Sequence, residues 1–502
     1  MALSKTLLSA FLIAIILSTM ALLGNMHFGA AQNGTTGDWP MFNHDTAHTG
    51  YSSSVAPMTN QTLWTFATGG AVETSPAVVN GIVYVGSDDG SVYALNAANG
   101  ALIWNYSTGG PVQSSPAVAD GVVYVGGFHS HAVFALNAYT GALVWRSPTD
   151  SIYPNEISST TVANGLVYVD ICNNGYGGEL DAFNASTGNL AWKYAPGNAW
   201  LPSSPAVYGG KVYIGTSQEV VALDAVTGEP SWSYYVVSNG PTSYGGSVIY
   251  FGDSSLSVSD GLLYIGTNNQ TVEAWDASTG SFVWSGDIKG SVYYSTIAVT
   301  NGAIYASTSW GGTIGTLQPP GVTALNANSG TLLWNNSLGS IQYSSPAVAG
   351  GMVFVGSDNT TSPFGVTEGQ SIYALNATTG ATIWTYKAGG AVYSSPAVAY
   401  GVVYVGSNDG KVYAIGDSQN TIPSPAPSPS PTSPSSTAIS SPTPMVPEFS
   451  FQALILVIVV GVVILAAVSL SVFRKRLKTK TISPLPLLQN STSVFTVQIS
   501  ER

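Results

Sequence analysis

Cysteine is nearly absent from this chain of 502 residues, in which Cys172 is the only one. A single cysteine excludes any disulfide within the chain, so a folded domain must be stabilised by its own core. A domain of roughly 400 residues can bury enough apolar surface to build such a core.

Charged residues are also scarce, at 8% of the chain, whereas there are 56 Gly and 11% aromatic residues. This balance favours short strands and tight turns over helices, which are rich in Glu, Lys and Ala. Positive charge is the rarer sign: residues 32–420 contain 23 Asp or Glu and 6 Lys or Arg, a net charge of −17 (6 − 23). An acidic body repels phosphate backbones, so we expect no nucleic-acid partner.

The common catalytic motifs are missing as well. The sequence has no Walker glycine loop and no G-x-S-x-G, and its five histidines show no H-E-x-x-H spacing. His129 and His131 would make a surface metal pair only if the turn that contains them brought them together. The segments Asp88–Gly90 and Asn408–Gly410 look like calcium loops, but their place between two strands predicts hairpin turns. Asn155, Glu156 and Asp170 are isolated acidic or amide candidates that we expect at the surface or in turns.

The N-terminal residues 1–31 have the layout of a secretory signal peptide. Lys5 precedes an apolar run from Leu7 to Leu23, and small residues follow at Gly29, Ala30 and Ala31. Cleavage before Gln32 is the expected outcome, and an uncleaved N-terminal anchor is the alternative.

A second hydrophobic segment, residues 449–473, carries no charge. Its core Ala453–Phe473 has 21 residues, which as a helix would span about 31 Å, the thickness of the hydrocarbon layer. Arg474, Lys475, Arg476 and Lys478 follow immediately. The positive-inside rule therefore predicts a single-pass membrane helix, with residues 474–502 as a cytoplasmic basic tail and the bulk of the chain outside the cell.

A stalk is predicted between the body and this helix, because residues 421–447 contain nine Pro and eight Ser. Such a segment cannot bury apolar surface and is biased toward extended polyproline II. Pro447-Glu448-Phe449 is similar to archaeal sorting signals, in which a tripeptide precedes a hydrophobic helix and a basic cluster. A retained anchor and a processed sorting signal both remain open.

The body of the chain is an internal repeat. Seven copies of the 11-residue pattern A-x-[DN]-x-x-[TSN]-G-x-x-x-W occur at spacings of 40 to 52 residues and end at Trp104, Trp145, Trp192, Trp232, Trp284, Trp334 and Trp384. Periods of this length indicate blades or solenoid coils. Each copy holds four β-like runs, in the second copy Ser114–Ala119, Val122–Gly126, Ala132–Leu136 and Ala142–Trp145. Four antiparallel strands, A to D, make one propeller blade.

Two fragments complete the count. Ala414–Asp417 begins an eighth copy, and Gln61–Trp64 ends one without a beginning. Joined across the chain ends, they predict an all-β, eight-bladed propeller over residues 61–420, closed by an N-terminal strand and preceded by a leading segment, residues 32–60. The eight tryptophans, Trp64 included, are expected to dock neighbouring blades, each burying roughly 150–250 Å². The Asn or Asp of each copy should bond the amides of its own turn.

The repeat resembles the pyrroloquinoline-quinone-type (quinoprotein) propeller repeat, on the 11-residue Trp pattern and on strand pairs such as Ser394–Ser407, SSPAVAYGVVYVGS. The segment Asp38–Gly50, DWPMFNHDTAHTG, is similar to sequences that precede such propellers. The resemblance covers residues 38–417 and implies the fold but no single function, because it includes both quinone-dependent alcohol dehydrogenases and cofactor-free interaction platforms such as the bacterial outer-membrane assembly lipoprotein.

The resemblance also implies what an enzyme of this kind would contain. The dehydrogenases carry a vicinal disulfide against the quinone, which one cysteine cannot form, and hold calcium with an Asn/Glu/Asp set for which no local motif is present. We therefore expect no cofactor and no resident metal, with pyrroloquinoline quinone and calcium required only under the dehydrogenase alternative.

Loop lengths point to one face of the propeller. Insertions occur only in D-to-A and B-to-C connections, which emerge on the same side, so that side is the expected binding face. The residue just before strand A lies at the mouth of the central channel and is, from blade to blade, Glu73, Gln113, Ile157, Pro202, Asp253, Tyr294, Tyr343 and Tyr393. The candidate binding rim consists of Glu73, Gln113, Asp253, Tyr294, Tyr343 and Tyr393. Alternatively, strand A begins with residues that merely tolerate water.

These features favour a non-catalytic, extracytoplasmic, membrane-anchored module that binds a protein or carbohydrate ligand on its loop-variable face. The alternative is a quinone-dependent oxidoreductase with a divergent site. A surface-layer or adhesion component is a third hypothesis.

Overall fold

The computed structural model describes residues 37–149, 156–172, 177–197, 203–216, 219–235, 254–292, 294–309, 320–339, 341, 343–358, 369–418 and 422–425. All of them lie in the first of the two units into which the chain divides, residues 1–430 and 431–502. The expected signal peptide, membrane helix and basic tail, most of the stalk, and also Asn155, Pro202 and Asp253 lie outside these ranges. Within them, no helix is long and apolar enough to cross a membrane.

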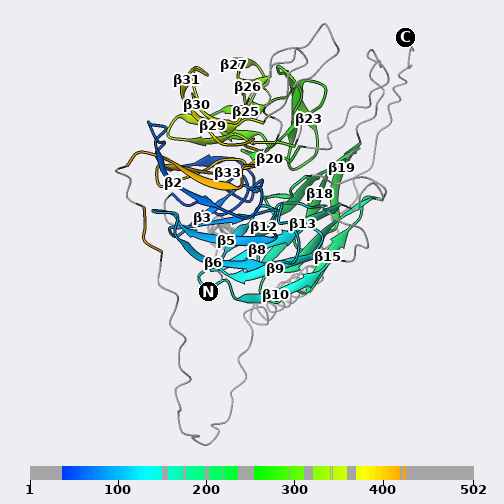
Figure 1. Cartoon of the computed structure of the whole chain (residues 1–502). Coiled ribbons are helices and arrows are strands. Elements are labelled where there is room, and N and C mark those ends of the chain that lie inside the picture. The colour runs from blue at the N-terminus through cyan, green and yellow to red at the C-terminus, as the bar shows by residue number, and fades with distance from the viewer. Residues whose placement is uncertain are drawn as a thin grey trace, which may run out of the picture. The chain divides into compact units, whose positions relative to one another are not determined.

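The described residues form eight sheets, each built on four antiparallel strands, which confirms the predicted eight-bladed propeller (Figure 1). The first four blades contain β3 (Ala77–Val79), β4 (Ile82–Gly86), β5 (Ser91–Asn96) and β6 (Leu102–Ser107); β7 (Ala117–Ala119), β8 (Val122–Gly127), β9 (Ala132–Asn137) and β10 (Leu143–Pro148); β12 (Thr161–Ala163), β13 (Leu166–Cys172), β14 (Gly178–Asn184) and β15 (Leu190–Tyr194); and β16 (Ala206–Tyr208), β17 (Lys211–Gly215), β18 (Glu219–Asp224) and β19 (Pro230–Tyr235). A short extra strand, β11 (Glu156–Ile157), pairs with β13 in blade 3.

The remaining blades contain β20 (Ser257–Ser259), β21 (Leu262–Gly266), β22 (Thr271–Asp276) and β23 (Phe282–Asp287); β24 (Ala298–Thr300), β25 (Ala303–Ser307), β26 (Gly321–Asn326) and β27 (Leu332–Ser337); β28 (Ala347–Ala349), β29 (Met352–Gly356), β30 (Ser371–Asn376) and β31 (Thr382–Lys387); and β32 (Ala397–Ala399), β33 (Val402–Ser407) and β34 (Lys411–Gly416). β1 (Tyr51–Ser52) adds to blade 7 as a parallel neighbour of β28.

Blade 8 takes its outer strand from the other end of the chain, as predicted. Its strand order is β2-β34-β33-β32, with β2 (Thr62–Ala67) contributed by the N-terminal part of the chain. Trp64 lies opposite Ala414 in this pairing, so the two sequence fragments meet in register. Figure 1 shows the blue β2 beside the orange β33 region. β2 thus completes blade 8 as its fourth strand and covers the edge that β34 would otherwise expose.

Strand A is shorter than predicted. The run Ser114–Ala119 was expected to be extended throughout, but only Ala117–Ala119 forms β7. Pro116 has no N–H to donate to a ladder. Before it, Ser114 Oγ donates to the Ser158 carbonyl and Ser115 N–H donates to Ser159 Oγ, both in the next blade. Strand D of the same blade is longer than expected, Leu143–Pro148 rather than 142–145.

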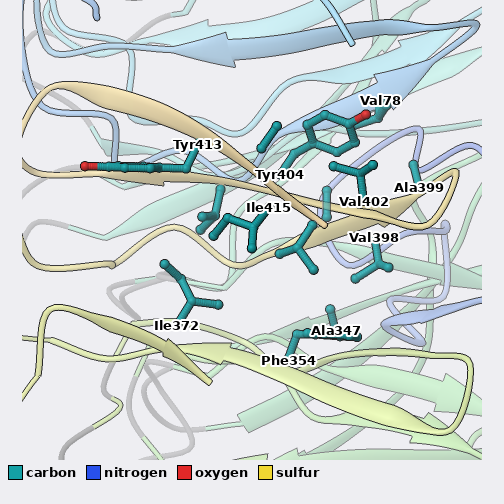
Figure 2. Packing of buried hydrophobic residues seen from close by; sticks show 14 of the residues in the cluster. Val78, Ala347, Phe354, Ile372, Val398, Ala399, Val402, Tyr404, Tyr413 and Ile415 are labelled. Atoms are coloured by element: carbon teal, nitrogen blue, oxygen red, sulfur yellow. The ribbon is translucent and has the colours of Figure 1, made fainter. Parts of the chain in front are cut away.

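The core lies between blades. Figure 2 shows Tyr404, Val402 and Ile415 of blade 8 packed between Ile372 and Phe354 of blade 7 on one side and Val78 of blade 1 on the other. At the outer part of each interface a tryptophan donates its Nε1–H to a carbonyl of the next blade, such as Trp104 to Ala138 at 2.8 Å. The same bond is made by Trp64, Trp145, Trp192, Trp232, Trp284 and Trp334, while Trp384 donates to Pro57.

The glycine of each repeat makes room for the preceding blade's tryptophan. Gly141 has φ +71°, and a Cβ there would lie 2.7 Å from the Trp104 ring. The positive φ is the left-handed conformation that only glycine adopts without strain. The Trp and the Gly of the 11-residue pattern are therefore partners across an interface, one from each blade.

Residues Asp38–Ser54, which we call the floor segment, run along the inner edges of the A strands. The N–H groups of Val118, Val207, Val258, Val299 and Val348 donate to carbonyls of this segment at 2.6–2.9 Å, and Trp39 exchanges two bonds with Val78. His48 Nε2 lies 3.1 Å from Thr161 Oγ1 of blade 3. Gly401 of blade 8 donates to Ser54 Oγ at 2.9 Å. One segment of 17 residues (38 to 54) thus bonds to all eight blades and closes one end of the central channel.

Within the floor segment, Asp45 fixes the local turn. Its carboxylate accepts the N–H groups of Ala47 and Thr49, both at 3.0 Å, and the Thr49 hydroxyl. Burial alone would raise the pKa of Asp45, but the bonds and charge supplied by His44, with those from Thr49, lower it overall. The segment therefore carries its own hydrogen-bonded scaffold.

The described chain leaves the propeller at this same end. Ile422 packs against the core cluster of blades 7, 8 and 1. The Pro423 carbonyl lies so close to Gly81, in the A-to-B turn of blade 1, that a Cβ at Gly81 would collide with it. A-to-B turns lie at the opposite end of the strands from the residues that precede strand A. Both ends of the described chain are therefore on the face opposite the predicted rim.

Candidate functional site at the mouth of the axial cavity

The rim residues that the structure describes are gathered around one cavity of about 470 Å³. Glu73, Gln113, Tyr294, Tyr343 and Tyr393 all line it, together with Ile157 of blade 3. Phe42 of the floor segment also lines it, so the cavity is a cup that opens at the rim and is closed below. Its volume lies in the range of roughly 300–1,000 Å³ that is typical of ligand pockets.

The three tyrosines form an aromatic arc over blades 6 to 8. Tyr294 and Tyr343 are stacked, with ring centroids 5.1 Å apart and an interplanar angle of 15°. Tyr343 and Tyr393 follow at 4.5 Å and 43°. Tyr294 is 40% exposed and has φ +52°, a conformation unusual for a bulky residue. A backbone held in this way keeps a large aromatic face at the mouth.

A polar arc continues the rim over blades 1 and 2. Glu73 Oε1 accepts the Asn408 side-chain amide at 3.0 Å, and Gln113 donates to Asp88 Oδ1 at 3.2 Å. In both cases the rim residue is held by the B-to-C turn of the preceding blade. The turns Asp88–Gly90 and Asn408–Gly410, predicted as hairpins, are hairpins, and they also orient the rim.

The electrostatics of this arc are acidic. Burial raises the pKa of Glu73, the charge of Asp88 raises it further, and the bond from Asn408 only partly opposes this. Burial likewise raises the pKa of Asp88, against the bond from Gln113 and with the charge of Asp89. Burial, Asp358 and Glu73 together raise the pKa of Tyr393. The mouth therefore disfavours additional negative charge.

Below the rim, each blade contributes a pair of adjacent hydroxyl residues. These pairs are Thr74-Ser75, Ser114-Ser115, Ser158-Ser159, Ser203-Ser204, Ser254-Ser255, Ser295-Thr296, Ser344-Ser345 and Ser394-Ser395. In six of the eight described blades the first hydroxyl of the pair accepts a backbone N–H of strand B in its own blade, as Ser114 does from Gly126 at 3.1 Å. This bond holds the start of strand A against strand B.

The second hydroxyl links one blade to the next. Ser75 N–H donates to Ser115 Oγ at 2.9 Å, and Ser395 N–H donates to Ser75 Oγ at 3.0 Å across the seam. The same link joins Ser115 to Ser159, Ser204 to Ser255, Thr296 to Ser345 and Ser345 to Ser395. We call the second residues of the eight pairs the hydroxyl ring. The hydroxyl ring was not predicted from the sequence, although the eightfold recurrence of the pair before strand A was a usable signal.

Asp170 is not where it was expected. We predicted a surface or turn position, but Asp170 is fully buried in β13, so this prediction was wrong. It occupies the position at which blades 1, 2 and 4 have Gly86, Gly126 and Gly215, inside an apolar strand. Ser203 Oγ lies 3.3 Å from Asp170 Oδ2, and burial holds the pKa of this carboxyl well above its usual range. It does not line the cavity. The backbone of Glu156 lies in β11.

The other metal candidates lie in turns. His129 and His131 are in the B-to-C turn between β8 and β9, each with a positive φ. Across the part of the chain that the structure describes, no three His, Cys, Asp or Glu residues are grouped so that they could hold a metal ion. Cys172 is buried and lines the cavity.

The sequence matches the family model of the outer membrane protein assembly factor BamB over residues 49–285, 295–370 and 320–421. The chain belongs to this BamB-like family of quinoprotein-type propellers. The match spans most of the propeller, which agrees with the repeat and the fold described above.

Relatives of known activity match over shorter stretches. The dehydrogenase subunit of the quinone alcohol dehydrogenase of Gluconobacter oxydans is 30% identical over 140 residues, covering 24% of this chain and 18% of the relative. The corresponding subunit of Acetobacter aceti is 31% identical over 123 residues, covering 21% and 16%. The match thus spans less than a fifth of the length of these curated relatives.

Solved structures of both kinds share the BamB-like fold. BamB from Moraxella catarrhalis superposes with a TM-score of 0.57 at 20% identity, covering 71% of this chain and 100% of that chain. The quinohemoprotein alcohol dehydrogenase of Comamonas testosteroni gives 0.59 at 19% identity, covering 76% and 81%. At these identities the likeness establishes the fold alone.

Proposed function

We propose that this chain is a non-catalytic binding module, displayed outside the cell on a membrane anchor, that captures a protein or carbohydrate ligand at the mouth of its axial cup. The observation that carries the proposal is the convergence of Glu73, Gln113 and three tyrosines on one cavity. These residues come from five different blades, so only the closed ring brings them together.

The form of the cup supports capture of a ligand's end. Phe42 and the floor segment close the lower end of the channel, so a chain cannot thread through it. The aromatic arc offers flat apolar surface with polar tips, and the polar arc offers fixed hydrogen-bonding groups. Both ends of the described chain lie on the face opposite the mouth.

The test is the combined replacement Tyr294→Ala, Tyr343→Ala and Tyr393→Ala in the full chain. We expect ligand capture to fall at least about ten-fold, since hot-spot aromatics each contribute about 2 kcal/mol or more. Binding would be measured by biolayer interferometry against purified cell-envelope proteins and an array of neutral and acidic glycans.

A matched control replaces Tyr51 and Tyr208 by Ala, two tyrosines that are each 38% exposed and do not line the cup. This variant should bind as the wild type does. Undiminished binding by the rim variant, at an unchanged melting temperature, would refute the proposed site.

A quinone-dependent oxidoreductase is the second candidate, favoured by the 30% identity to the Gluconobacter subunit. Pyrroloquinoline quinone is a planar polycarboxylate, so a site for it should supply cationic or metal-held partners for its carboxylates. The described lining of the cup contains the carboxylate of Glu73, with hydroxyl, amide and aromatic groups, and no Lys or Arg. The donor set present there does not fit this cofactor.

The direct discriminating assay incubates the full chain with pyrroloquinoline quinone and calcium and follows alcohol-dependent dye reduction. We expect no saturable activity above the protein-free control. Saturable turnover that is lost on calcium chelation would establish the oxidoreductase instead.

A further inference from the structure

The hydroxyl ring at the base of the cup has unused hydrogen-bonding capacity. Six of its members, Ser75, Ser115, Ser159, Ser204, Ser255 and Ser395, line the cavity. Each hydroxyl can donate one hydrogen bond and accept two. In the links described above, Ser75, Ser115, Ser159, Ser255 and Ser395 use their oxygen to accept a backbone N–H.

The hydroxyl hydrogens of these ring serines have no acceptor among the described residues. Apart from Ser159, each of the six is at least nine-tenths buried: Ser75 5%, Ser115 4%, Ser204 6%, Ser255 8% and Ser395 4% exposed. A hydroxyl that borders an open cup can donate its hydrogen to whatever occupies the cup, whether solvent or ligand. All six side chains border the cup, so an occupant of the cup is placed to accept from them.

The chemistry of the ring and of the mouth restricts that occupant. An ammonium or guanidinium group has no acceptor, so it would leave the ring hydrogens unpaired. An anion would accept from the ring, but it would meet Glu73 and a body of net charge −17 (6 − 23 over residues 32–420). An apolar end group would neither accept hydrogen bonds from the ring serines nor donate one to Glu73. A neutral group rich in hydroxyl oxygens accepts from the serines and donates to Glu73.

The aromatic arc above the ring narrows the class further. A sugar ring carries an apolar face of C–H groups and an edge of hydroxyls. The C–H face can pack on the rings of Tyr294, Tyr343 and Tyr393, and the hydroxyl edge can hydrogen-bond to the ring serines. We infer that the cup is a carbohydrate subsite, which takes the uncharged terminal sugar of a glycan with its hydroxyls on the hydroxyl ring. This inference rests on the proposed function and specifies the ligand class of the same site.

The experiment is calorimetric titration of the full chain, in a polyoxyethylene detergent that has no sugar headgroup, with lactose, cellobiose, mannobiose and chitobiose. A glucuronate-ended disaccharide and a trilysine peptide are the charged probes. At least one neutral disaccharide should bind and should do so more tightly than either charged probe. If no neutral disaccharide binds, or if a charged probe binds more tightly, the ligand class is wrong.

The ring variant Ser75→Ala, Ser115→Ala and Ser395→Ala should weaken the neutral sugar at least about ten-fold, since each lost hydrogen bond contributes about 0.5–1.5 kcal/mol. Its matched control is Ser254→Ala, Ser344→Ala and Ser394→Ala, the first members of three pairs, which are equally buried but do not line the cup. The control also loses internal hydrogen bonds, yet it should bind sugar within about two-fold of the wild type.

A second ring variant guards against loss of folding. Ser75→Thr, Ser115→Thr and Ser395→Thr keep a hydroxyl at each position. A threonine is compatible with this position of the fold, because Thr296 occupies it in blade 6 and its N–H donates to Ser345 Oγ. The added methyl groups reduce the space at the base of the cup, so sugar binding should fall without a change in melting temperature. Wild-type affinity in both ring variants would overturn the subsite.

The rim variant separates this inference from the proposed function. Suppose that the tyrosine replacement abolishes capture of a protein ligand, and that neither the wild type nor any variant binds a neutral sugar. The proposed binding function is then supported, and the carbohydrate subsite is refuted. If neither rim nor ring changes affect any ligand, both are refuted.

Discussion

The outer part of each blade interface and the mouth of the cup are built from the same repeat, but the residue is constant from blade to blade at the interface and varies at the mouth. At the interface the same residue recurs eight times, a tryptophan that donates to a carbonyl. In seven cases this carbonyl belongs to the next blade, and for Trp384 it is that of Pro57, between the floor segment and β2. At the mouth the described positions hold Glu, Gln, Ile and three Tyr. Positions that are repeated maintain the ring, and positions that vary are available for recognition. Changes in the first set should lower stability and spare binding, and changes at the mouth should do the reverse.

The largest effect is expected for Trp104→Ala. Removing this ring leaves a cavity between blades 1 and 2 and takes away one of the two side-chain hydrogen bonds to the Ala138 carbonyl, which should lower the free energy of unfolding by about 3–5 kcal/mol. Urea unfolding monitored by circular dichroism measures it. Leu102→Ala on the same strand removes a side chain that is 48% exposed and should change stability by about 0.5 kcal/mol or less. Equal losses in the two variants would contradict the docking role.

The floor segment should make stability depend on pH through His48. Burial lowers the pKa of this histidine to about 4, although the charge of Asp45 opposes the shift. The unfolded chain, with a histidine pKa near 6.5, therefore binds a proton that the folded chain does not. The stability contributed by neutral His48 is complete above pH 6.5 and is lost as the pH falls toward 4, by about 2–3 kcal/mol at pH 4.5.

The measurement compares urea unfolding of the wild type and of His48→Gln at pH 7.5 and pH 4.5. The variant should lose less stability than the wild type on acidification, because the other acidic groups titrate in both proteins. Parallel pH profiles would show that His48 is not the responsible group.

Glycine-to-alanine changes at positions of similar φ should lower stability by different amounts, depending on which atoms lie beside the glycine. Gly141→Ala adds a Cβ 2.7 Å from the Trp104 ring at φ +71°, and should lower stability by about 2 kcal/mol or more. Gly165 has φ +73° and no atom within 4 Å of its Cβ position, so Gly165→Ala should lower it by about 1 kcal/mol. Thermal melts of the two variants give the difference. A reversed order would mean that the tryptophan can move away.

The smallest effect is expected in an exposed C-to-D loop. Asp224 Oδ1 accepts the N–H groups of Val226 and Thr227, at 3.0 and 2.9 Å, and the Thr227 hydroxyl. Asp224→Ala should lower the melting temperature slightly, by an amount equivalent to about 1 kcal/mol. Asp224→Asn keeps the accepting oxygen and should restore most of the loss, as the Asn residues of the other blades imply.

The sequence predicted the propeller closely, because each blade is marked by a local sequence pattern that can be recognised without knowledge of its neighbours. The Trp-ended repeat predicted the number of blades, and the fragments at Ala414 and Trp64 predicted the closing strand. The register also predicted which residues precede strand A. That Glu73 and Tyr393 would then share one cavity follows from closure of the ring, since they are 320 residues apart (73 to 393).

The parts that the sequence did not predict depend on contacts between blades. The hydroxyl ring consists of bonds from one blade to the next, which no single repeat displays. The path of the floor segment was missed because, apart from β1 and the Trp39 bridge, it has no regular pairing pattern. Asp170 was misplaced because a carboxylate inside an apolar strand is rare, and charged residues are expected at the surface.

The floor segment also determines the order in which the molecule can be completed. Residues 38–54 leave the ribosome before any blade does, yet Ser54 has its partner at Gly401, 347 residues later. β2 likewise cannot pair until β34, the last strand of the propeller to be synthesised, is available. Contacts this distant in sequence form slowly and late. The part of the described chain that is synthesised first is therefore the last to make its native contacts. Until it does, the channel is not closed by the floor segment and blade 8 lacks its outer strand.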